Sequence, residues 1–256
     1  MKKIANPILS IITINYNNKQ GLIQTIESVV NQTWKNFEYL VVDGGSTDGS
    51  KDVITQHIND LTYWVSERDK GIYNAMNKGI EMATGDYLLF LNSGDVFKDP
   101  SVLEYIYTHL DSAGIVYGDI ECVPNQGENW IVYTPSRLSF QFFTKNTIPH
   151  QSAFIRKELF DQYGLYDEKL KICADWKFFV EVICKHNVSY KYVSGVIASY
   201  FLDGISSMEE NRELTTREKQ EYLLNNFSAF MPDYDEFDRW NKQRIVKWLK
   251  KVHLIR

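Results

Sequence analysis

Along the first part of the chain, short apolar runs alternate with stretches in which apolar residues recur every three or four positions. The runs predict buried β-strands at 8–14, 37–42, 62–65 and 87–91. The recurring stretches predict helices at 22–30, 53–58 and 72–82. Strands that alternate with helices at this interval favour a parallel, right-handed, doubly wound sheet. We therefore expect a nucleotide-binding type of half-domain over about residues 1–100.

The second half of the chain shows a more mixed pattern. Further strands are predicted at 115–123, 130–133, 152–155 and 188–193, and further helices at 103–110, 157–163, 175–183, 209–225 and 235–253. The run at 130–133 is expected to pair back on the strand before it, which gives the sheet an antiparallel edge. We expect one α/β domain over residues 1–205, with about 101–205 as its second half, and a helical extension over residues 206–256.

The strand predicted at 87–91 ends abruptly in a polar turn. Asn92, Ser93, Gly94 and Asp95 supply an amide, a hydroxyl, a flexible glycine and a carboxylate. Ligands in open α/β sheets bind beyond the carboxyl ends of the strands, and a carboxylate there could hold a divalent cation and, through it, a diphosphate. The same composition is also typical of an ordinary turn, so the residues alone leave both interpretations open.

No common phosphate-binding loop is present after the first strand. The strand is followed by NYNNKQG, which matches neither GxGxxG nor GxxxxGK followed by Ser or Thr. Three cations, Arg68, Lys70 and Lys78, lie near the predicted phosphate end and could stabilise a departing diphosphate. A solvated surface charge is the alternative for each of them.

Composition narrows the function classes and the compartment. A balance of 28 Lys and Arg against 33 Asp and Glu gives a net charge of −5, which argues against a nucleic-acid partner. Cys122, Cys173 and Cys184 are spaced for neither a zinc site nor a disulfide framework, which indicates a reducing compartment. The apolar run after Pro7 reads as a strand rather than a signal peptide, and no segment has the apolar length of a membrane span. We therefore expect a cytoplasmic protein.

The end of the chain is basic and amphipathic. Residues 239–256 carry cations and no acid, namely Arg239, Lys242, Arg244, Lys247, Lys250, Lys251 and Arg256. Five apolar residues fall on one helical face: Ile245, Trp248, Leu249, Val252 and Ile255. This pattern is typical of a helix that lies on an anionic membrane, which would make the protein peripheral on the inner face of the cell membrane. A helix packed on the domain has the same periodicity, so both remain open.

Five stretches, taken together and in order, resemble glycosyltransferase family 2, whose inverting enzymes have the A-type glycosyltransferase fold. They read SIITINYN, SVVNQTW, VVDGGSTDGS, KGIYNAMNKGIEMATGDYLLFLNSGD and KICADWKFF. The similarity runs unbroken over about residues 8–205 and is greatest to bacterial enzymes that build surface polysaccharides such as colanic acid or capsule. It implies a Rossmann-like, mostly parallel sheet, with a nucleotide-sugar half before about residue 100 and an acceptor half, carrying the catalytic base, after it.

The resemblance implies roles for residues at the donor end. Tyr16 matches the aromatic that the family places against the nucleotide base, and Asp43 matches its first acid after the second strand, near the uracil or ribose. Asp69 matches a position that lines the nucleotide pocket, close to the cation Lys78. Gly44 stands where the family often has a second acid, and a Tyr that fills the sheet edge is the alternative for Tyr16.

The family's metal-binding turn is altered in this chain. The family commonly writes Asp-Ser-Asp-Asp, where this sequence has Asn92, Ser93, Gly94 and Asp95. One carboxylate together with the oxygens of a diphosphate can still bind Mg²⁺ or Mn²⁺, because Mg²⁺ is often held by one or two carboxylates plus substrate phosphates. We therefore expect Asp95 to be the metal ligand, with Asn92 and Ser93 supporting the nucleotide sugar.

The resemblance places the catalytic base at Asp175, although Ala174 replaces the Glu of the family's Glu-Asp motif. In a single displacement the acceptor hydroxyl must lose its proton, and a carboxylate at a helix start can take it. An ordinary helix cap is the alternative for Asp175. Trp176 is expected to stack on the acceptor sugar or to pack in the core. His150 matches an acceptor-side loop, and a structural, hydrogen-bonded histidine is its alternative.

Together these matches imply a metal-dependent, inverting glycosyltransferase. We expect it to move a sugar from a nucleotide sugar, UDP-linked, to a hydroxyl of a glycan or lipid-linked oligosaccharide in bacterial surface polysaccharide biosynthesis. A nucleotidyltransferase on a similar sheet is a rival, but it should carry a Gly-rich basic loop in place of NYNNKQG. A nucleotide-sugar-binding protein that has lost catalysis is the other, because the turn at 92–95 has lost acids.

Overall fold

The parallel strands expected in the first half form one side of a continuous sheet. In the computed structural model, which describes residues 7–202 and 209–242, the strand order is β3-β2-β1-β4-β8-β6-β9-β5, with β7 paired to β6. The strands are β1 (Leu9–Asn15), β2 (Phe37–Asp43), β3 (Tyr63–Ser66), β4 (Tyr87–Phe90), β5 (Val96–Phe97), β6 (Ile115–Val123), β7 (Trp130–Val132), β8 (Ala153–Arg156) and β9 (Tyr190–Phe201). β3, β2, β1 and β4 pair in parallel, whereas β8 joins β4 and β6 antiparallel.

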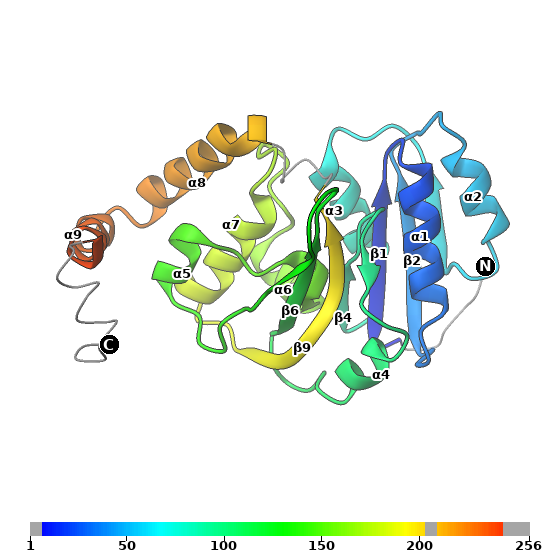
Figure 1. Ribbon diagram of the computed structural model, residues 1–256, viewed down its shortest axis with the longest axis horizontal. Coiled ribbons are helices and arrows are strands. Elements are labelled where there is room, and N and C mark those ends of the chain that lie inside the picture. The colour runs from blue at the N-terminus through cyan, green and yellow to red at the C-terminus, as the bar shows by residue number, and fades with distance from the viewer. Residues whose placement is uncertain (1–6, 203–208, 243–256) are drawn as a thin grey trace.

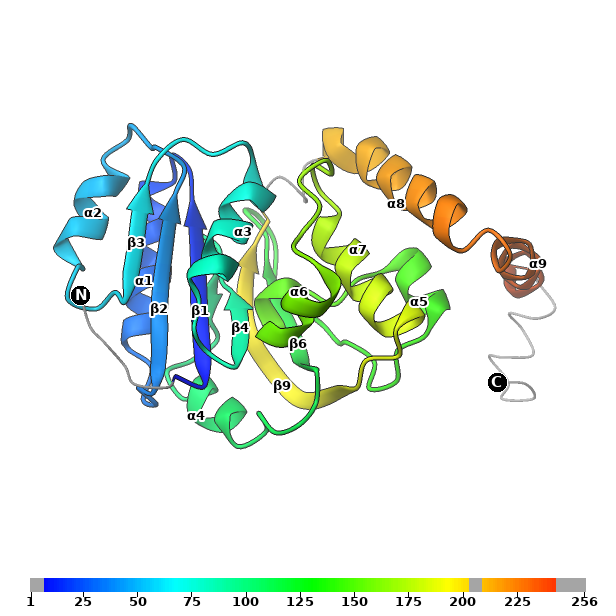
Figure 2. The same cartoon turned by 180° about the vertical axis from the view of Figure 1, so that it is seen from behind.

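Helices cover both faces of this sheet, as Figures 1 and 2 show from opposite sides. The helices are α1 (Lys19–Val30), α2 (Ser50–Gln56), α3 (Ile72–Met82), α4 (Val102–Tyr107), α5 (Phe140–Lys145), α6 (Lys157–Tyr163), α7 (Ala174–Val180), α8 (Arg212–Asn226) and α9 (Met231–Lys242). Shorter turns are the 3-10 segments η1 (His150–Ser152) and η4 (Glu209–Asn211), and a π-helical turn, η2 (Glu181–Lys185), continues α7.

The central strand β1 is buried along its whole length. Leu9 and Ile11 pack into one hydrophobic cluster with residues of α1, while Ile12 and Ile14 pack into another with residues of α3, α6 and α7. Successive side chains of a strand point to opposite faces, so a strand covered on both faces needs a continuous apolar run. The run of isoleucines in β1 therefore follows from its place between two helical layers, and the predicted α/β class is confirmed.

Several predicted elements have the expected bounds, and others differ. β6, α3 and α6 begin and end where the sequence predicted, and β7 pairs back on β6. The helix expected at 53–58 ends at Gln56. β9 continues beyond the predicted end at residue 193, because Gly195, with a φ of 137°, lets the strand bend where its register against β6 shifts. The short elements β5 and α5 were missed, since neither is long enough to show a periodic pattern.

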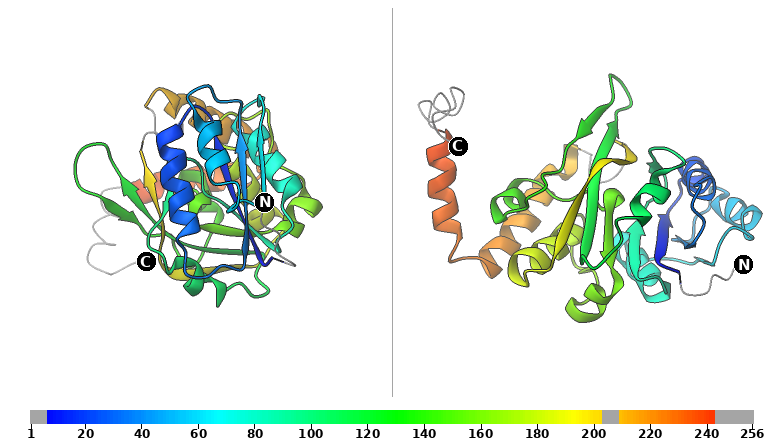
Figure 3. Two further views of the ribbon diagram at one scale, coloured as in Figure 1. Left: turned by 90° about the vertical axis from the view of Figure 1, so that its right-hand side faces the viewer. Right: turned by 90° about the horizontal axis from the view of Figure 1, so that it is seen from below.

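The C-terminal helices extend to one side of the domain, with α9 at the far end (Figure 3). α8 is anchored there because Leu223 and the residue after the helix, Phe227, join the hydrophobic cluster that includes α7. α9 covers part of the helix predicted at 235–253, and the remainder of the basic tail lies outside the described residues. The domain boundary at residue 205 stays a prediction. No helix in the described part of the chain has the length and apolar character needed to cross a membrane.

Candidate active site

A cleft of about 1440 Å³ opens at the carboxyl ends of the parallel strands. One wall comes from the segments that follow β1 to β4, and includes Tyr16, Gly44, 68–71 and 92–95. The facing wall comes from η1, α5, α7 and α8, and includes Lys145, His150, Asp175, Trp176, Thr215 and Lys219. Residues from the two halves of the sequence therefore meet across one cavity, which is the arrangement expected for a donor and an acceptor site.

A buried hydrogen-bond network lies at the ends of these strands. Asn15, the last residue of β1, donates through Nδ2 to Asp43 Oδ1 at 2.7 Å and accepts at Oδ1 from Ser93 Oγ at 2.7 Å. Asp43, the last residue of β2, also accepts from Ser46 Oγ at 2.5 Å and from Ser66 Oγ, at the end of β3, at 2.7 Å. The network thus joins the ends of all four parallel strands.

Asp43 is taken up by this network rather than presented to the cleft. Its side chain is fully buried and is not among the residues that line the cavity. Burial alone would raise the pKa of Asp43, but the hydrogen bonds from Ser46, Ser66 and Asn15 lower it. In this structure the oxygens of Asp43 fix the strand ends, and its contact with the uracil or ribose stays a prediction.

The cations at the donor end have separate surroundings. Asp69 lines the cleft, as expected, and its Oδ1 lies 2.6 Å from Lys78 Nζ. Lys78 also pairs with Glu67 at 2.7 Å and does not line the cleft, so its predicted contact with a diphosphate is not supported by its position. Arg68 and Lys70 do line the cleft, so of these three cations they are the two placed to reach a diphosphate there.

The turn over 92–95 is fixed from α1. Gly94, with a φ of 105°, donates its N–H to Thr25 Oγ1 at 2.9 Å, and this hydroxyl lies 2.7 Å from the carbonyl oxygen of Asp95. Asn92, Ser93 and Asp95 all line the cleft, although Asp95 is largely buried. The turn therefore holds an amide and a carboxylate at the cavity in a defined conformation.

The oxygens of this turn fit a hard divalent cation that takes most of its coordination from a bound diphosphate and water. Asn92 Oδ1 is buried without a hydrogen-bond partner in the described structure, and the Asp95 carboxylate lies on the same turn. Oxygens of this kind are the ligands that Mg²⁺ and Mn²⁺ take. No group of three or more His, Cys, Asp or Glu within residues 7–202 and 209–242 could hold a metal, so diphosphate and water oxygens would complete the coordination.

Across the cleft, Asp175 lies in the first turn of α7 with about 14% of its side chain exposed. Tyr73, from α3, donates its hydroxyl to Asp175 Oδ1 at 2.9 Å and also lies 2.5 Å from the carbonyl oxygen of Ile172. His150 Nδ1 lies 3.4 Å from Asp175 Oδ2. Both carboxylate oxygens are therefore oriented by neighbours, and each can still accept a further hydrogen bond from a group in the cleft.

These neighbours keep the Asp175 carboxylate ionised. Burial alone would raise the pKa of Asp175, but the hydrogen bonds from His150 and Tyr73 lower it below its ordinary value. Burial and the charge of Asp175 raise the pKa of Tyr73, so its hydroxyl remains a donor. The site presents an oriented, charged carboxylate, which is the form that a general base requires.

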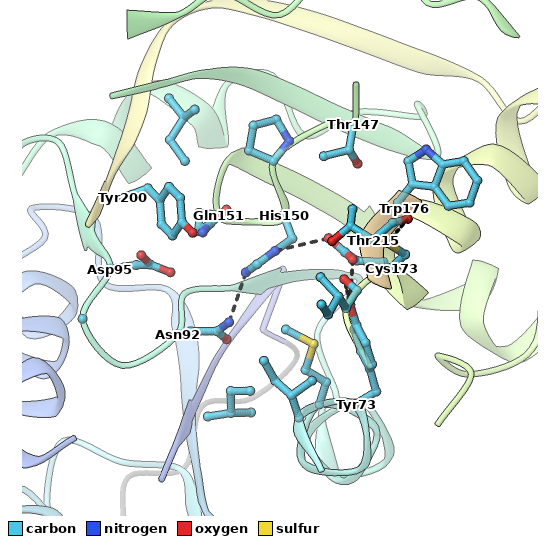
Figure 4. A pocket seen from close by; sticks show the side chains of 18 of the residues that line it. Tyr73, Asn92, Asp95, Thr147, His150, Gln151, Cys173, Trp176, Tyr200 and Thr215 are labelled. Carbon is cyan, nitrogen blue, oxygen red and sulfur yellow. Dashed lines mark hydrogen bonds and ion pairs between the residues drawn. The ribbon is translucent and has the colours of Figure 1, made fainter. Parts of the chain in front are cut away.

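His150 connects this carboxylate to the opposite wall. Its Nε2 lies 3.1 Å from Nδ2 of Asn92, a contact that Figure 4 shows as a dashed line. An amide NH₂ can only donate, so Nε2 accepts and the proton of the neutral imidazole lies on Nδ1, facing Asp175. A continuous chain of polar contacts therefore runs from the turn after β4, through His150, to the carboxylate on α7.

The comparisons with known proteins agree with this geometry. The family model for Glycosyl transferase family 2 matches residues 10–164. The chain belongs to this glycosyltransferase family. A PGL/p-HBAD biosynthesis glycosyltransferase of Mycobacterium bovis is 30% identical over 221 residues, which are 84% of this chain and 85% of that protein. An uncharacterized glycosyltransferase of Mycobacterium tuberculosis is 34% identical over 189 residues, 70% of this chain and 71% of that protein.

Solved structures show that this glycosyltransferase has the A-type fold predicted from the sequence. S. aureus TarS 1–349 in complex with UDP-GlcNAc matches with a TM-score of 0.66 and 19% identity over 85% of this chain and 66% of that chain. The mannosyltransferase PcManGT from Pyrobaculum calidifontis, in complex with GDP-Man and Mn²⁺, matches with a TM-score of 0.59 and 18% identity over 79% of this chain and 59% of that one. The glycosyltransferase thus spans less than two thirds of PcManGT and about two thirds of TarS 1–349.

The sequence indicated no role for Tyr73, and it left His150 and Trp176 with two interpretations each. Tyr73 is a buried residue of α3, and only the fold brings its hydroxyl to Asp175. His150 is hydrogen-bonded, as its alternative interpretation held, but its partners place it between the two walls. Trp176 is almost fully buried and donates from Nε1 to the carbonyl oxygen of Phe143 at 2.8 Å, which favours the core interpretation.

Replacement of Tyr16 by alanine should weaken UDP binding without affecting the fold. Tyr16 is 69% exposed and lines the donor wall, and base–aromatic stacking contributes about 1–3 kcal/mol, so we expect the Kd for UDP to rise about tenfold or more. Calorimetric titration measures this change. Tyr133→Ala is the matched control, since Tyr133 is 73% exposed and lines the same cleft. Equal losses in the two variants would contradict a base-stacking role for Tyr16.

Proposed function

We propose that this glycosyltransferase is an inverting enzyme that moves a sugar from a UDP-linked donor to a hydroxyl of a glycan or lipid-linked oligosaccharide. The acceptor class and a role in bacterial surface polysaccharide biosynthesis rest on the sequence resemblance. TarS, a structural neighbour, binds UDP-GlcNAc, and PcManGT binds GDP-Man, which supports a nucleotide-sugar donor. The net charge of −5 supports the absence of a nucleic-acid partner.

The observation that carries this proposal is the contact chain from Asn92 through His150 to Asp175. It supports the proposal because an ionised carboxylate lies on the wall opposite the turn where the diphosphate would bind, in a fixed relation to that turn. In an in-line displacement, the attacking oxygen and the leaving oxygen lie on opposite sides of the anomeric carbon. A single base on the wall that faces the diphosphate turn is the arrangement that such a reaction needs.

In the proposed reaction, Asp175 takes the proton of the acceptor hydroxyl while the acceptor oxygen forms its bond to the anomeric carbon. The bond from that carbon to the phosphate oxygen breaks, and its electron pair leaves with UDP. The pKa of Asp175, lowered by its neighbours, keeps it ionised before each turnover. Tyr73 and His150 orient the carboxylate, so its side chain loses less conformational entropy on reaching the reactive geometry.

The leaving diphosphate would be stabilised at the donor wall. Arg68 and Lys70 line the cleft there and supply positive charge. Asp95, supported by Asn92, would hold Mn²⁺ or Mg²⁺, and the bound cation would neutralise charge on the departing diphosphate.

The location of the protein belongs to the same proposal. A cytosolic nucleotide sugar and a lipid-linked acceptor would meet at the inner face of the cell membrane, where the basic segment 239–256 could bind anionic lipid. Most of that segment lies outside the described residues, so its packing on the domain stays open as the alternative.

Replacement of Asp95 by alanine should remove the metal dependence of donor binding. We expect Mn²⁺ to tighten UDP binding to the wild type by about tenfold or more, because one carboxylate ligand to the cation contributes at least the binding free energy of one hydrogen bond to a charged group. We expect Mn²⁺ to have no effect on UDP binding to Asp95→Ala. Calorimetric titration with and without Mn²⁺ measures both. Asp86→Ala, exposed beside the other end of β4, is the matched control. UDP binding that ignores Mn²⁺ in every variant would contradict the metal assignment.

Replacement of His150 by glutamine should shift the pH dependence of turnover. Without the hydrogen bond from His150, burial of Asp175 is less opposed, so the pKa of that carboxyl rises and the acid limb of the kcat profile moves to higher pH. Release of UDP from a panel of UDP-glucose, UDP-galactose and UDP-N-acetylglucosamine measures the profile. His186→Gln is the control, because His186 is exposed and stacks on Tyr163. An acid limb that stays in place in His150→Gln would count against Asp175 as the base.

A further inference from the structure

A buried carboxylate from the C-terminal helix α8 holds the segment that leads into the catalytic helix. Glu218, about 7% exposed, accepts three backbone N–H groups in a row. Oε1 accepts from Lys171 at 2.7 Å, and Oε2 accepts from Ile172 at 3.1 Å and from Cys173 at 3.0 Å. Carboxylates that accept backbone N–H groups in this way make hydrogen bonds about twice as strong as neutral ones.

These three N–H groups lie directly before helix α7, which carries Asp175. Cys173 is the N-cap residue of α7, and Asp175 lies two residues further on. Backbone N–H groups before a helix have no partner within it and must be satisfied from outside. Glu218 supplies that partner from a helix more than forty positions away in the chain, as the separations of 47, 46 and 45 residues show.

The same segment is fixed from its other side by the cleft. The single hydroxyl proton of Tyr73 faces two acceptors, the carbonyl oxygen of Ile172 at 2.5 Å and Asp175 Oδ1 at 2.9 Å. Glu218 holds the N–H groups of the segment while Tyr73 holds a carbonyl, so the peptide planes before Asp175 are set by contacts from α8 and α3. The position of the Asp175 side chain therefore depends on this backbone segment.

α8 is therefore part of the site rather than a separate appendage. Thr215 and Lys219 of this helix line the cleft, and Cys173 Sγ lies 3.7 Å from the carbonyl oxygen of Thr215. The match to the family model ends at residue 164, before both α7 and α8. The contact of Glu218 with the α7 entry is thus a property of this chain that the family match does not include.

We propose that Glu218 is a positioning residue that acts through Asp175, by fixing residues 171–173 so that the carboxylate meets the acceptor hydroxyl. This inference rests on the proposed function, in which Asp175 is the base. Displacements of about 1 Å at a catalytic group can cost about 10²-fold in rate, so loss of the carboxylate should lower turnover even though Glu218 does not itself line the cleft.

The test replaces Glu218 by glutamine, which keeps the shape of the side chain and removes its charge. We expect kcat for UDP release from the UDP-sugar panel to fall about 10- to 100-fold with KM for the donor unchanged, because donor contacts lie on the opposite wall. Glu221→Gln is the matched control, since Glu221 is exposed on the same helix. Glu218→Asp, which keeps the charge, should recover part of the lost kcat. Calorimetric binding of UDP to each variant confirms that the donor half is folded.

A double variant separates positioning from general stabilisation. If Glu218 acts through Asp175, Glu218→Gln added to Asp175→Asn should lower kcat no further. Equal kcat in wild type and Glu218→Gln would overturn the inference, as would a further loss in the double variant as large as the loss in the single one. Failure of the proposed function gives a different result, namely wild-type turnover in Asp175→Asn. That result would overturn the inference about Glu218 as well.

Discussion

The site depends on a hydrogen-bond network that fixes the carboxyl ends of four parallel strands. Asn15 joins Asp43 and Ser93 through its two amide atoms, and Asp43 extends the network to Ser66. An aspartate buried this deeply is costly unless its oxygens are satisfied, so the network constrains its members to one arrangement. Because the segments that follow these strands form the donor wall, the position of every donor-side group depends on it.

The facing wall is built by convergence of elements far apart in sequence. Asp175 receives contacts from α3 through Tyr73 and from η1 through His150, while α8 fixes the backbone before it through Glu218. Each contact alone has an ordinary structural explanation. Together they hold one carboxylate, nearly withdrawn from solvent, in its ionised form and at a fixed place across from the turn over 92–95. Buried carboxylates are costly to ionise, so a site in which groups from α3 and η1 both keep one charged has the electrostatics of a general base.

The sequence predicted the fold class, the strand before the turn over 92–95 and the helix that begins near Asp175, because each has a clear hydrophobic period or capping signal. It predicted less well which polar residues face the cleft. Asp43 and Lys78 have the residue types expected at a donor site, yet their charges are satisfied by Ser46 and Ser66 in one case and by Asp69 and Glu67 in the other. The contacts of Tyr73 on α3 and of Glu218 on the polar helix α8 could not be predicted, because contacts between residues far apart in the chain leave no local sequence pattern.

If Asp175 is the base of a glycosyl transfer reaction, Asp175→Asn should remove most of the turnover and leave the donor site intact. The amide keeps the size of the side chain but cannot take a proton. We expect UDP affinity equal to wild type and turnover of the UDP-sugar panel lowered by about 10²–10⁴-fold, the usual contribution of a general base. Turnover close to wild type would show that Asp175 is not the base. Loss of UDP binding together with turnover would contradict the assignment of Asp175 to the acceptor wall.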